Sequence, residues 1–117
     1  MSTHSWPHIK SVQDIDRIID ASHEKPQLIY KHSTRCNLSA TVKLRLEQWD
    51  KTARLLPIHY LDLISYRSVS DYIEKHFKVL HESPQVLIIS KGQSIYDEDH
   101  FRINGEDIEK ALHTAMA

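Results

Sequence analysis

The sequence contains very little cysteine and glycine. Among its 117 residues Cys36 is the only cysteine, and Gly92 and Gly105 are the only glycines. One cysteine cannot form an intramolecular disulfide, and two distant glycines cannot form a glycine-rich loop that cradles phosphates. We therefore exclude a disulfide-stapled scaffold and expect no nucleotide cofactor.

Long hydrophobic runs and an excess of one charge are also missing. No stretch approaches the roughly 18 consecutive apolar residues of a membrane span, and residues 1–10 lack the apolar core of a signal peptide. We therefore expect a soluble, cytoplasmic protein without a membrane partner, in a compartment where thiols stay reduced. Lys and Arg number 15 against 16 Asp and Glu. Without a basic field, nucleic acid is not an expected partner.

What the sequence does contain is the pattern of one globular domain over residues 1–117. Hydrophobic residues make up 40% and charged residues 26%, a balance close to that of average globular proteins. Apolar residues at helical spacing predict a helix over residues 12–23, capped by Ser11. The short apolar run 27–32 predicts the first strand.

The middle of the chain predicts a βαβ unit followed by another helix. From Leu38 to Leu56 apolar residues, Trp49 among them, recur every three or four positions and predict one long helix. Pro57 ends this helix, and residues 58–64 predict a second strand parallel to the first. The next helix is expected to be capped by Ser68, with Val69, Tyr72, Ile73, Phe77 and Leu80 on its inner side.

The last third of the chain predicts a β-hairpin and a closing helix. Strands over 85–90 and 93–96 flank a tight turn at Lys91-Gly92, in which Gly92 supplies a positive φ. Asn104 can cap the closing helix. Its inner face is expected to carry Ile108, Ala111, Leu112, Ala115 and Met116.

This order of elements predicts an α/β fold. The order helix, β, α, β, α, β, β, α matches a thioredoxin-like three-layer α/β/α sandwich with a central four-stranded mixed sheet and an N-terminal helix. Other α/β sandwiches can share the order, so individual positions carry the more specific information.

Cys36 follows the first strand and begins the long helix. Its sulfur should lie beside the free N–H groups of the first helical turn, which stabilise a thiolate. Helix N-termini and nearby cations lower a cysteine pKa from about 8.5 to about 3.5–7.5, and Arg35 adjoins this thiol. We predict an activated nucleophile; the alternative is a buried cysteine that acts as a small hydrophobic residue.

Ser39 stands where a Cys-x-x-Cys redox motif has its second thiol. Cys36 can attack a disulfide, but the resulting adduct must wait for an external thiol. The Ser39 hydroxyl can hydrogen-bond to the Cys36 sulfur or satisfy backbone donors of the first turn, and both alternatives stay open.

Two stretches of the sequence resemble a known family. Residues 31–39, Lys-His-Ser-Thr-Arg-Cys-Asn-Leu-Ser, and 82–87, Glu-Ser-Pro-Gln-Val-Leu, with the Lys91-Gly92 turn, resemble the YtxJ-type monothiol bacilliredoxins. These are thioredoxin-like proteins of the bacillithiol system, and the resemblance spans most of the chain. The family typically carries Cys-Pro-Ile-Ser at the first stretch, so Asn37 and Leu38 depart from it here.

The resemblance implies a monothiol thiol-disulfide exchange protein. It would remove bacillithiol, or a similar small thiol, from mixed disulfides on cytosolic proteins. Cys36 and Ser39 would be the catalytic residues. The implied partners are S-thiolated cytosolic proteins, and the co-substrate is a low-molecular-weight thiol.

The resemblance also implies a set of substrate-binding residues. Pro84 occupies the position of the cis proline of thioredoxin-like folds, and Ser83 before it would offer backbone groups to an extended substrate. Arg35 and Asn37, on either side of the thiol, complete the set. If Arg35 converges on the thiol together with Lys31 and Lys43, the site prefers an anionic small thiol.

The chain has nine histidines, but none of them predicts a metal site. His4 and His8 have a suitable spacing, yet Pro7 separates them and no second pair follows, so we expect no metal. His32 could pair with the thiolate, although strand alternation favours a structural histidine.

Two functions of other classes stay open. The missing second cysteine is compatible with a thioredoxin-like binding module that has lost its chemistry. A third alternative is a redox sensor in which Cys36 is itself modified without catalytic turnover.

Overall fold

The computed structural model describes residues 6–116, which are built around one four-stranded mixed sheet. The strands lie in the order β2-β1-β3-β4, with β1 parallel to β2 and antiparallel to β3, and β4 antiparallel to β3. Their bounds are β1 Gln27–His32, β2 Ile58–Asp62, β3 Gln85–Ser90 and β4 Gln93–Asp99.

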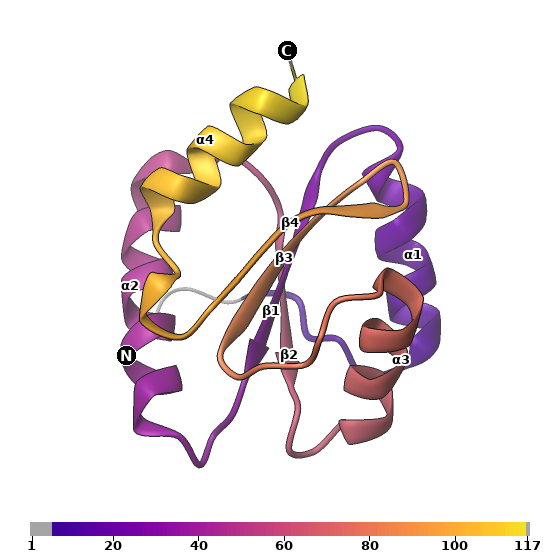
Figure 1. The fold of residues 1–117 in the computed structure, drawn as a ribbon, viewed down its shortest axis with the longest axis vertical. Helices are drawn as coiled ribbons and strands as arrows, with labels where there is room; N and C mark the ends of the chain where they lie inside the picture. Colours follow the sequence, from indigo (N-terminus) through magenta and orange to yellow (C-terminus); the bar gives the residue numbers. More distant parts are fainter. Residues whose placement is uncertain (1–5, 117) are drawn as a thin grey trace.

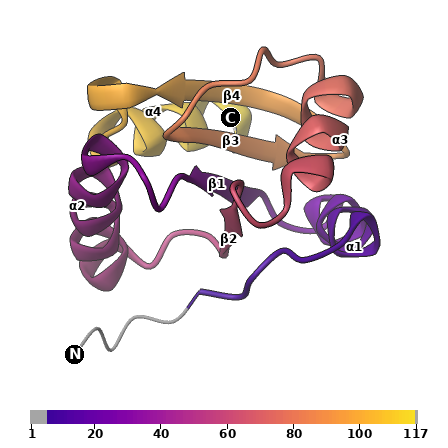
Figure 2. The ribbon, with the colours of Figure 1, turned by 90° about the horizontal axis from the view of Figure 1, so that it is seen from below.

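Helices cover both faces of this sheet (Figure 1). Two helices pack on each face, so that the sheet is the middle of three layers (Figure 2). One face carries α2 (Asn37–Ala53) and α4 (Gly105–Met116), and the other carries α1 (Val12–Ser22) and α3 (Arg67–Phe77). The predicted three-layer sandwich is confirmed. No helix in the described part of the chain is both long and apolar enough to cross a membrane.

The alternation of side chains along β1 divides the core into two apolar layers. Leu28 and Tyr30 face α2 and α4, whereas Ile29 faces α1 and α3. All residues of β1 are buried, because it lies between two strands and between both helix layers. This central strand leads directly to Cys36.

The segment before α1 lies along the outer edge of β2. The N–H of Ile9 donates to the carbonyl of Tyr60, and the N–H of Tyr60 donates to the carbonyl of Pro7, each at 2.8 Å. Ile9 is buried in the core layer of α1 and α3. The chain thus adds a short parallel bridge beside β2, and Figure 2 shows this segment passing on the β2 side of the sheet.

Helix α2 ends earlier than predicted. Its last residue is Ala53, because Arg54 takes a left-handed conformation with φ of 46° and its N–H donates to the carbonyl of Asp50. Leu56 is nevertheless buried, in the loop that precedes β2. Its apolar spacing therefore reflects burial beyond the helix end, and the predicted extension to Leu56 is wrong.

Helix α3 differs from its prediction at both ends. It begins before Ser68, because N–H groups of its first turn bond to the carbonyl of Tyr66. The predicted cap Ser68 is an exposed residue of the helix itself. The helix ends at Phe77, since Lys78 has a φ of 58°. Leu80, predicted on the inner side, is 75% exposed.

The hairpin turn has the predicted geometry. Lys91 and Gly92 have φ values of 52° and 78°, the pair of positive angles that matches the twist of the flanking strands. The second strand of the hairpin, β4, continues three residues beyond its predicted end at Tyr96. A short 3-10 helix that was not predicted, η1 (His100–Arg102), follows it.

The N-terminus of α4 is capped as predicted. The side-chain oxygen of Asn104 accepts a hydrogen bond from the N–H of Asp107 at 2.9 Å. Ile108 and Leu112 are buried on the inner face, but Ala115, predicted to join them, is exposed. The helix leaves the sheet before its last turn, as Figure 1 shows.

Candidate thiol site

Cys36 lies at the end of the sheet where the chain passes from β1 into α2. It is the N-cap residue of α2, with φ of −116° and ψ of 118°, and it is partly exposed. Its N–H donates to the carbonyl of Ser33 at 3.2 Å, which closes the turn after β1. The carbonyl of Cys36 accepts the first hydrogen bond of the helix, from Ala40. The predicted position at a helix start is confirmed.

The first turn of α2 lowers the pKa of the Cys36 thiol. The backbone N–H of Ser39 has the largest effect, and the Ser39 hydroxyl and the N–H of Leu38 lower the pKa further, whereas desolvation opposes them. The N–H groups of Leu38 and Ser39 are among the backbone donors that a helix N-terminus leaves without a partner inside the helix. The thiolate is therefore stabilised by hydrogen bonds from its own helix.

The Ser39 hydroxyl connects two sides of the site. Ser39 is fully buried, and its oxygen accepts a hydrogen bond from the backbone N–H of Ser33 at 3.4 Å. The same hydroxyl carries the proton that can be donated to the Cys36 thiolate. The hydroxyl thus acts on the sulfur, the first of the two alternatives, whereas the backbone donor that it satisfies belongs to Ser33, before the helix, and not to the first turn of α2.

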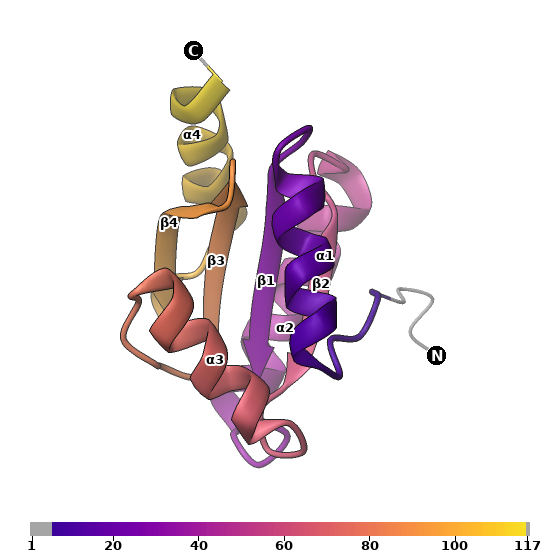
Figure 3. The ribbon, with the colours of Figure 1, turned by 90° about the vertical axis from the view of Figure 1, so that its right-hand side faces the viewer.

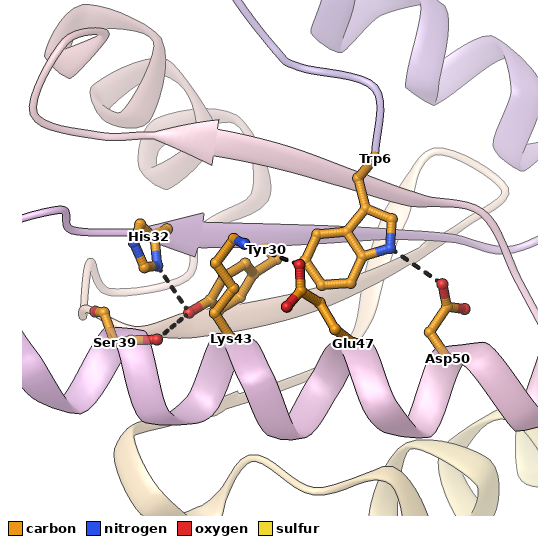
Figure 4. A network of polar contacts seen from close by, with 7 residues as sticks. All are labelled: Trp6, Tyr30, His32, Ser39, Lys43, Glu47 and Asp50. Atoms are coloured by element: carbon orange, nitrogen blue, oxygen red, sulfur yellow. Dashed lines mark hydrogen bonds and ion pairs between the residues drawn. The ribbon is translucent and has the colours of Figure 1, made fainter. Parts of the chain in front are cut away.

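Beneath this turn lies a buried polar network that the sequence did not reveal (Figure 4). The Tyr30 hydroxyl donates to the carbonyl of Ser39 at 3.0 Å, and its oxygen lies 3.1 Å from Nδ1 of His32. The single proton of the Tyr30 hydroxyl is used in the bond to Ser39. The contact with His32 is therefore a hydrogen bond only when Nδ1 of His32 is protonated and donates to the Tyr30 oxygen. The network fixes the first turn of α2 on β1. The available signal was the alternation that places Tyr30 and His32 on one face of the strand.

His32 has a structural environment. It is buried, and desolvation, together with the charge of Lys43, lowers its pKa. A neutral imidazole bonded to Tyr30 is therefore favoured over an imidazolium paired with the thiolate. This agrees with the interpretation preferred from strand alternation.

Ser83 and Pro84 lie at the same end of the sheet as Cys36. Gln85 pairs with Lys31 near the end of β1, so the preceding Pro84 lies where β1 leads towards the thiol. The Ser83–Pro84 peptide bond is cis, as predicted. The carbonyl of Pro84 accepts a hydrogen bond from the N–H of His100 at 3.0 Å, which joins this segment to η1.

The two residues that flank the thiol are exposed. Arg35 precedes Cys36 in the turn, where its backbone N–H donates to the hydroxyl of Ser33 at 3.4 Å. Asn37 is the first residue of α2, and its carbonyl accepts from Thr41. Both are accessible to a substrate at Cys36, and their binding roles remain predictions.

The cations near the thiol in sequence do not gather around it. Lys43 forms an ion pair with Glu47 at 2.9 Å (Figure 4). Its ammonium also lies over the rings of Trp6 and Tyr60. Lys31 is fully buried and its charge is influenced by acids of α3. The convergence considered from sequence is therefore absent, because strand and helix periodicity turn these side chains away.

The histidines do not assemble a metal site in the part of the chain described. His4 lies outside the described residues, and the ring of His8 packs beside Tyr60 with centroids 4.9 Å apart. No group of three His, Cys, Asp or Glu side chains within residues 6–116 could hold a metal ion.

A thiol at the N-terminus of a helix that follows the central strand, with a proline segment beside it, defines a thioredoxin-fold redox protein. Solved structures agree with this class. A protein with a thioredoxin fold is 28% identical, covers 90% of this chain and 91% of its own length, and has a TM-score of 0.81.

Two thioredoxins are similar in fold at lower identity. Oxidized mitochondrial thioredoxin 3 from Saccharomyces cerevisiae is 13% identical, with 93% of this chain and 94% of its own covered and a TM-score of 0.74. Thioredoxin from Trypanosoma brucei brucei is 14% identical, with coverages of 99% and 96% and a TM-score of 0.75.

The family follows from the sequence match. Residues 7–108 match the model of the monothiol bacilliredoxin BrxC, and the chain belongs to this family. Its function is thiol-disulfide redox chemistry. The resemblance stated from the residues around Cys36 and Pro84 is thereby confirmed.

Proposed function

We propose that this protein removes bacillithiol, or a similar small thiol, from mixed disulfides on cytosolic proteins. The observation that carries the proposal is the environment of Cys36. Its thiolate is stabilised by the first turn of α2, while Ser39 occupies the place of a second thiol. Membership of the monothiol bacilliredoxin family supports the choice of bacillithiol.

The reaction is an exchange of disulfides in which atoms and electrons balance. The Cys36 thiolate attacks the bacillithiol sulfur of the mixed disulfide, and a new bond forms between these two sulfurs. The bond to the substrate protein breaks, and the protein leaves as a thiolate that takes a proton from water. A second low-molecular-weight thiol then attacks the bacillithiol sulfur of the adduct, so that a disulfide of the two small thiols forms and Cys36 leaves as a thiolate.

The absence of a second cysteine in the sequence determines how long the adduct lasts. In a dithiol site an internal thiol would attack the adduct, whereas the Ser39 hydroxyl forms hydrogen bonds and cannot resolve a disulfide. The adduct on Cys36 therefore persists until an external thiol arrives. The proposed setting is the cytoplasm, where such thiols are abundant.

Intact-mass spectrometry tests the proposal. The reduced protein is mixed with a bacillithiol-modified protein, and the Cys36→Ser variant is treated in parallel. The expected result is that the protein with Cys36 gains the mass of one bacillithiol, that the donor loses the same mass, and that the Cys36→Ser variant gains nothing.

Other outcomes would contradict the proposal. If the donor lost its bacillithiol equally well to the Cys36→Ser variant, Cys36 would be excluded as the nucleophile. No transfer, with Cys36 still open to iodoacetamide, would favour a binding module. The same assay with a glutathione-modified donor shows whether the protein accepts bacillithiol in preference to glutathione.

A further inference from the structure

Tyr30 is a fully buried tyrosine of β1 whose hydroxyl contacts the helix that carries the thiol. Its ring lies among those of Trp6, His32 and Tyr60, at centroid distances of 6.1, 5.7 and 6.2 Å. Burial raises the pKa of the hydroxyl above its ordinary value, so the hydroxyl keeps its proton at neutral pH. The core therefore contains one neutral O–H donor directly behind the thiol turn.

The Tyr30 hydroxyl joins the two elements that the thiol turn connects. Figure 3 shows β1 leading down to this turn, with α1 and α3 in front of the sheet and α2 behind it. Because side chains alternate along a strand, Tyr30 points to the α2 side. Its hydroxyl donates to the carbonyl of Ser39, nine positions along the chain, at 3.0 Å. This hydrogen bond encloses the segment that contains Cys36.

His32 determines which way the Tyr30 hydroxyl points. Nδ1 of His32 lies 3.1 Å from the Tyr30 oxygen, and both side chains are buried. An unprotonated Nδ1 would compete with the carbonyl of Ser39 for the single proton of the hydroxyl. A protonated Nδ1 donates to the hydroxyl oxygen and leaves that proton for Ser39. The hydrogen bonds then run in one direction, from the imidazole through the phenol to the helix.

Ser39 is held from two sides by residues of β1 and of the thiol turn. Its carbonyl accepts from Tyr30, and its Oγ accepts from the backbone N–H of Ser33 at 3.4 Å. The side chain of an N-cap residue lies next to the N–H groups two and three residues on, which for Cys36 are those of Leu38 and Ser39. The N–H and the hydroxyl proton of Ser39 are also groups that lower the pKa of the thiol.

We propose that Tyr30 is a positioning residue for the thiol: its hydroxyl holds Ser39 where the N–H and the hydroxyl of Ser39 are directed at the Cys36 sulfur. His32 orients the Tyr30 hydroxyl. This inference rests on the proposed exchange at Cys36 and adds two buried residues to it. Both act through Ser39, so their effect is on the population of the thiolate and not on the recognition of a substrate.

The test measures alkylation of Cys36 by iodoacetamide against pH. The Tyr30→Phe variant removes only the hydroxyl, and its profile is expected to shift to higher pH. Below the midpoint of the profile the rate should fall about 2- to 5-fold, which corresponds to part of one hydrogen bond. At high pH, where every thiol is ionised, the rate is expected to equal that of the unmodified protein.

A second tyrosine supplies the matched control. Tyr96 packs against the same core layer, and its buried hydroxyl has no hydrogen-bond partner among the described residues. The Tyr96→Phe variant therefore loses the same atom without losing a contact, and its profile should coincide with that of the unmodified protein.

Two variants of His32 test the direction of the hydrogen bonds. In His32→Asn an amide N–H takes the place of Nδ1, and the profile should stay close to that of the unmodified protein. In His32→Leu no donor remains, and the profile should shift in the same direction as in Tyr30→Phe. Equal profiles for the two variants would contradict an orienting role for His32.

The outcomes separate this inference from the proposed function. An unshifted profile in Tyr30→Phe would overturn the role of Tyr30, and so would an equal shift in Tyr96→Phe. A lower rate at high pH would also overturn it, because access to the sulfur would then have changed. Iodoacetamide reports on the thiolate without bacillithiol. A shifted profile in Tyr30→Phe therefore supports the positioning role even if the unmodified protein accepts no bacillithiol, a result that would reject the proposed function alone.

Discussion

Ser39 contributes to the site through its backbone N–H and through its hydroxyl. Its oxygen accepts from the Ser33 N–H, and its proton is available to the Cys36 thiolate. The hydroxyl is the part of Ser39 that substitution can remove, because the backbone N–H remains. Reactivity of the thiol at neutral pH therefore depends in part on this one group.

We expect Ser39→Ala to raise the pKa of Cys36 by about 0.5–1 unit, the value of one hydrogen bond to a partly solvated anion. Absorbance of the thiolate at 240 nm, followed against pH, measures this shift. Thr52→Ala, an exposed residue near the far end of α2, is the control. An unchanged pKa in Ser39→Ala would assign stabilisation of the thiolate to the backbone alone.

The site could be predicted from the sequence only where it depends on neighbours in the chain. Cys36 and Ser39 are three residues apart at a helix start, so their proximity follows from helix geometry. The contact between Tyr30 and Ser39 could not be predicted, because it depends on how α2 packs on β1. The burial of Lys31 beneath α3 likewise requires the packing of a distant helix.

At the scale of elements, the sequence predicted existence and order but several ends were wrong. Helix ends that depend on a side-chain cap, at Ser11 and Asn104, were predicted correctly. The ends of α2 and α3 depend on left-handed residues, Arg54 and Lys78. Neither is glycine or asparagine, so nothing in the local sequence marks the end.

Gly105 gives an element-scale prediction. It is the first residue of α4, where alanine would ordinarily favour the helix by up to about 1 kcal/mol. A Cβ at this position would overlap the ring of Trp49 on α2. We expect Gly105→Ala to destabilise the protein by about 1–3 kcal/mol, because overpacking outweighs the helix preference.

Urea unfolding of a double-mutant cycle checks this expectation. Trp49→Leu alone removes the hydrogen bond from the indole to Glu109, and the double variant with Gly105→Ala should lose less than the sum of the two. Strict additivity, or a gain in stability from Gly105→Ala alone, would show that the two helices do not meet closely at this point.

At the scale of the whole molecule, buried imidazoles make stability depend on pH. Burial lowers the pKa of His32, His59 and His81 below the ordinary value. Below about pH 6.5 the unfolded chain binds more protons than the folded one. The free energy of unfolding therefore decreases as the pH is lowered through this range. Asp97, whose pKa is raised by burial, acts in the opposite sense but is one group against three.

We expect the free energy of unfolding to decrease from pH 7 to about pH 5, in urea titrations at each pH. His59→Gln should reduce the slope of this dependence, because its partly buried ring no longer titrates. His113→Gln, at an exposed position of α4, should leave the slope unchanged. A free energy of unfolding that stays constant over this range would contradict the prediction.

The bridge between the N-terminal segment and β2 has a consequence for how copies of the molecule behave towards one another. An outer strand with free backbone groups is a template on which another chain can extend the sheet. Here Pro7 and Ile9 occupy the outward N–H and carbonyl of Tyr60, so the chain itself blocks that template. The opposite outer strand, β4, ends in Asp97, Glu98 and Asp99, and two such acidic strands repel each other. Both borders of the sheet therefore oppose aggregation by strand addition, and a crowded solution of this protein should favour separate molecules.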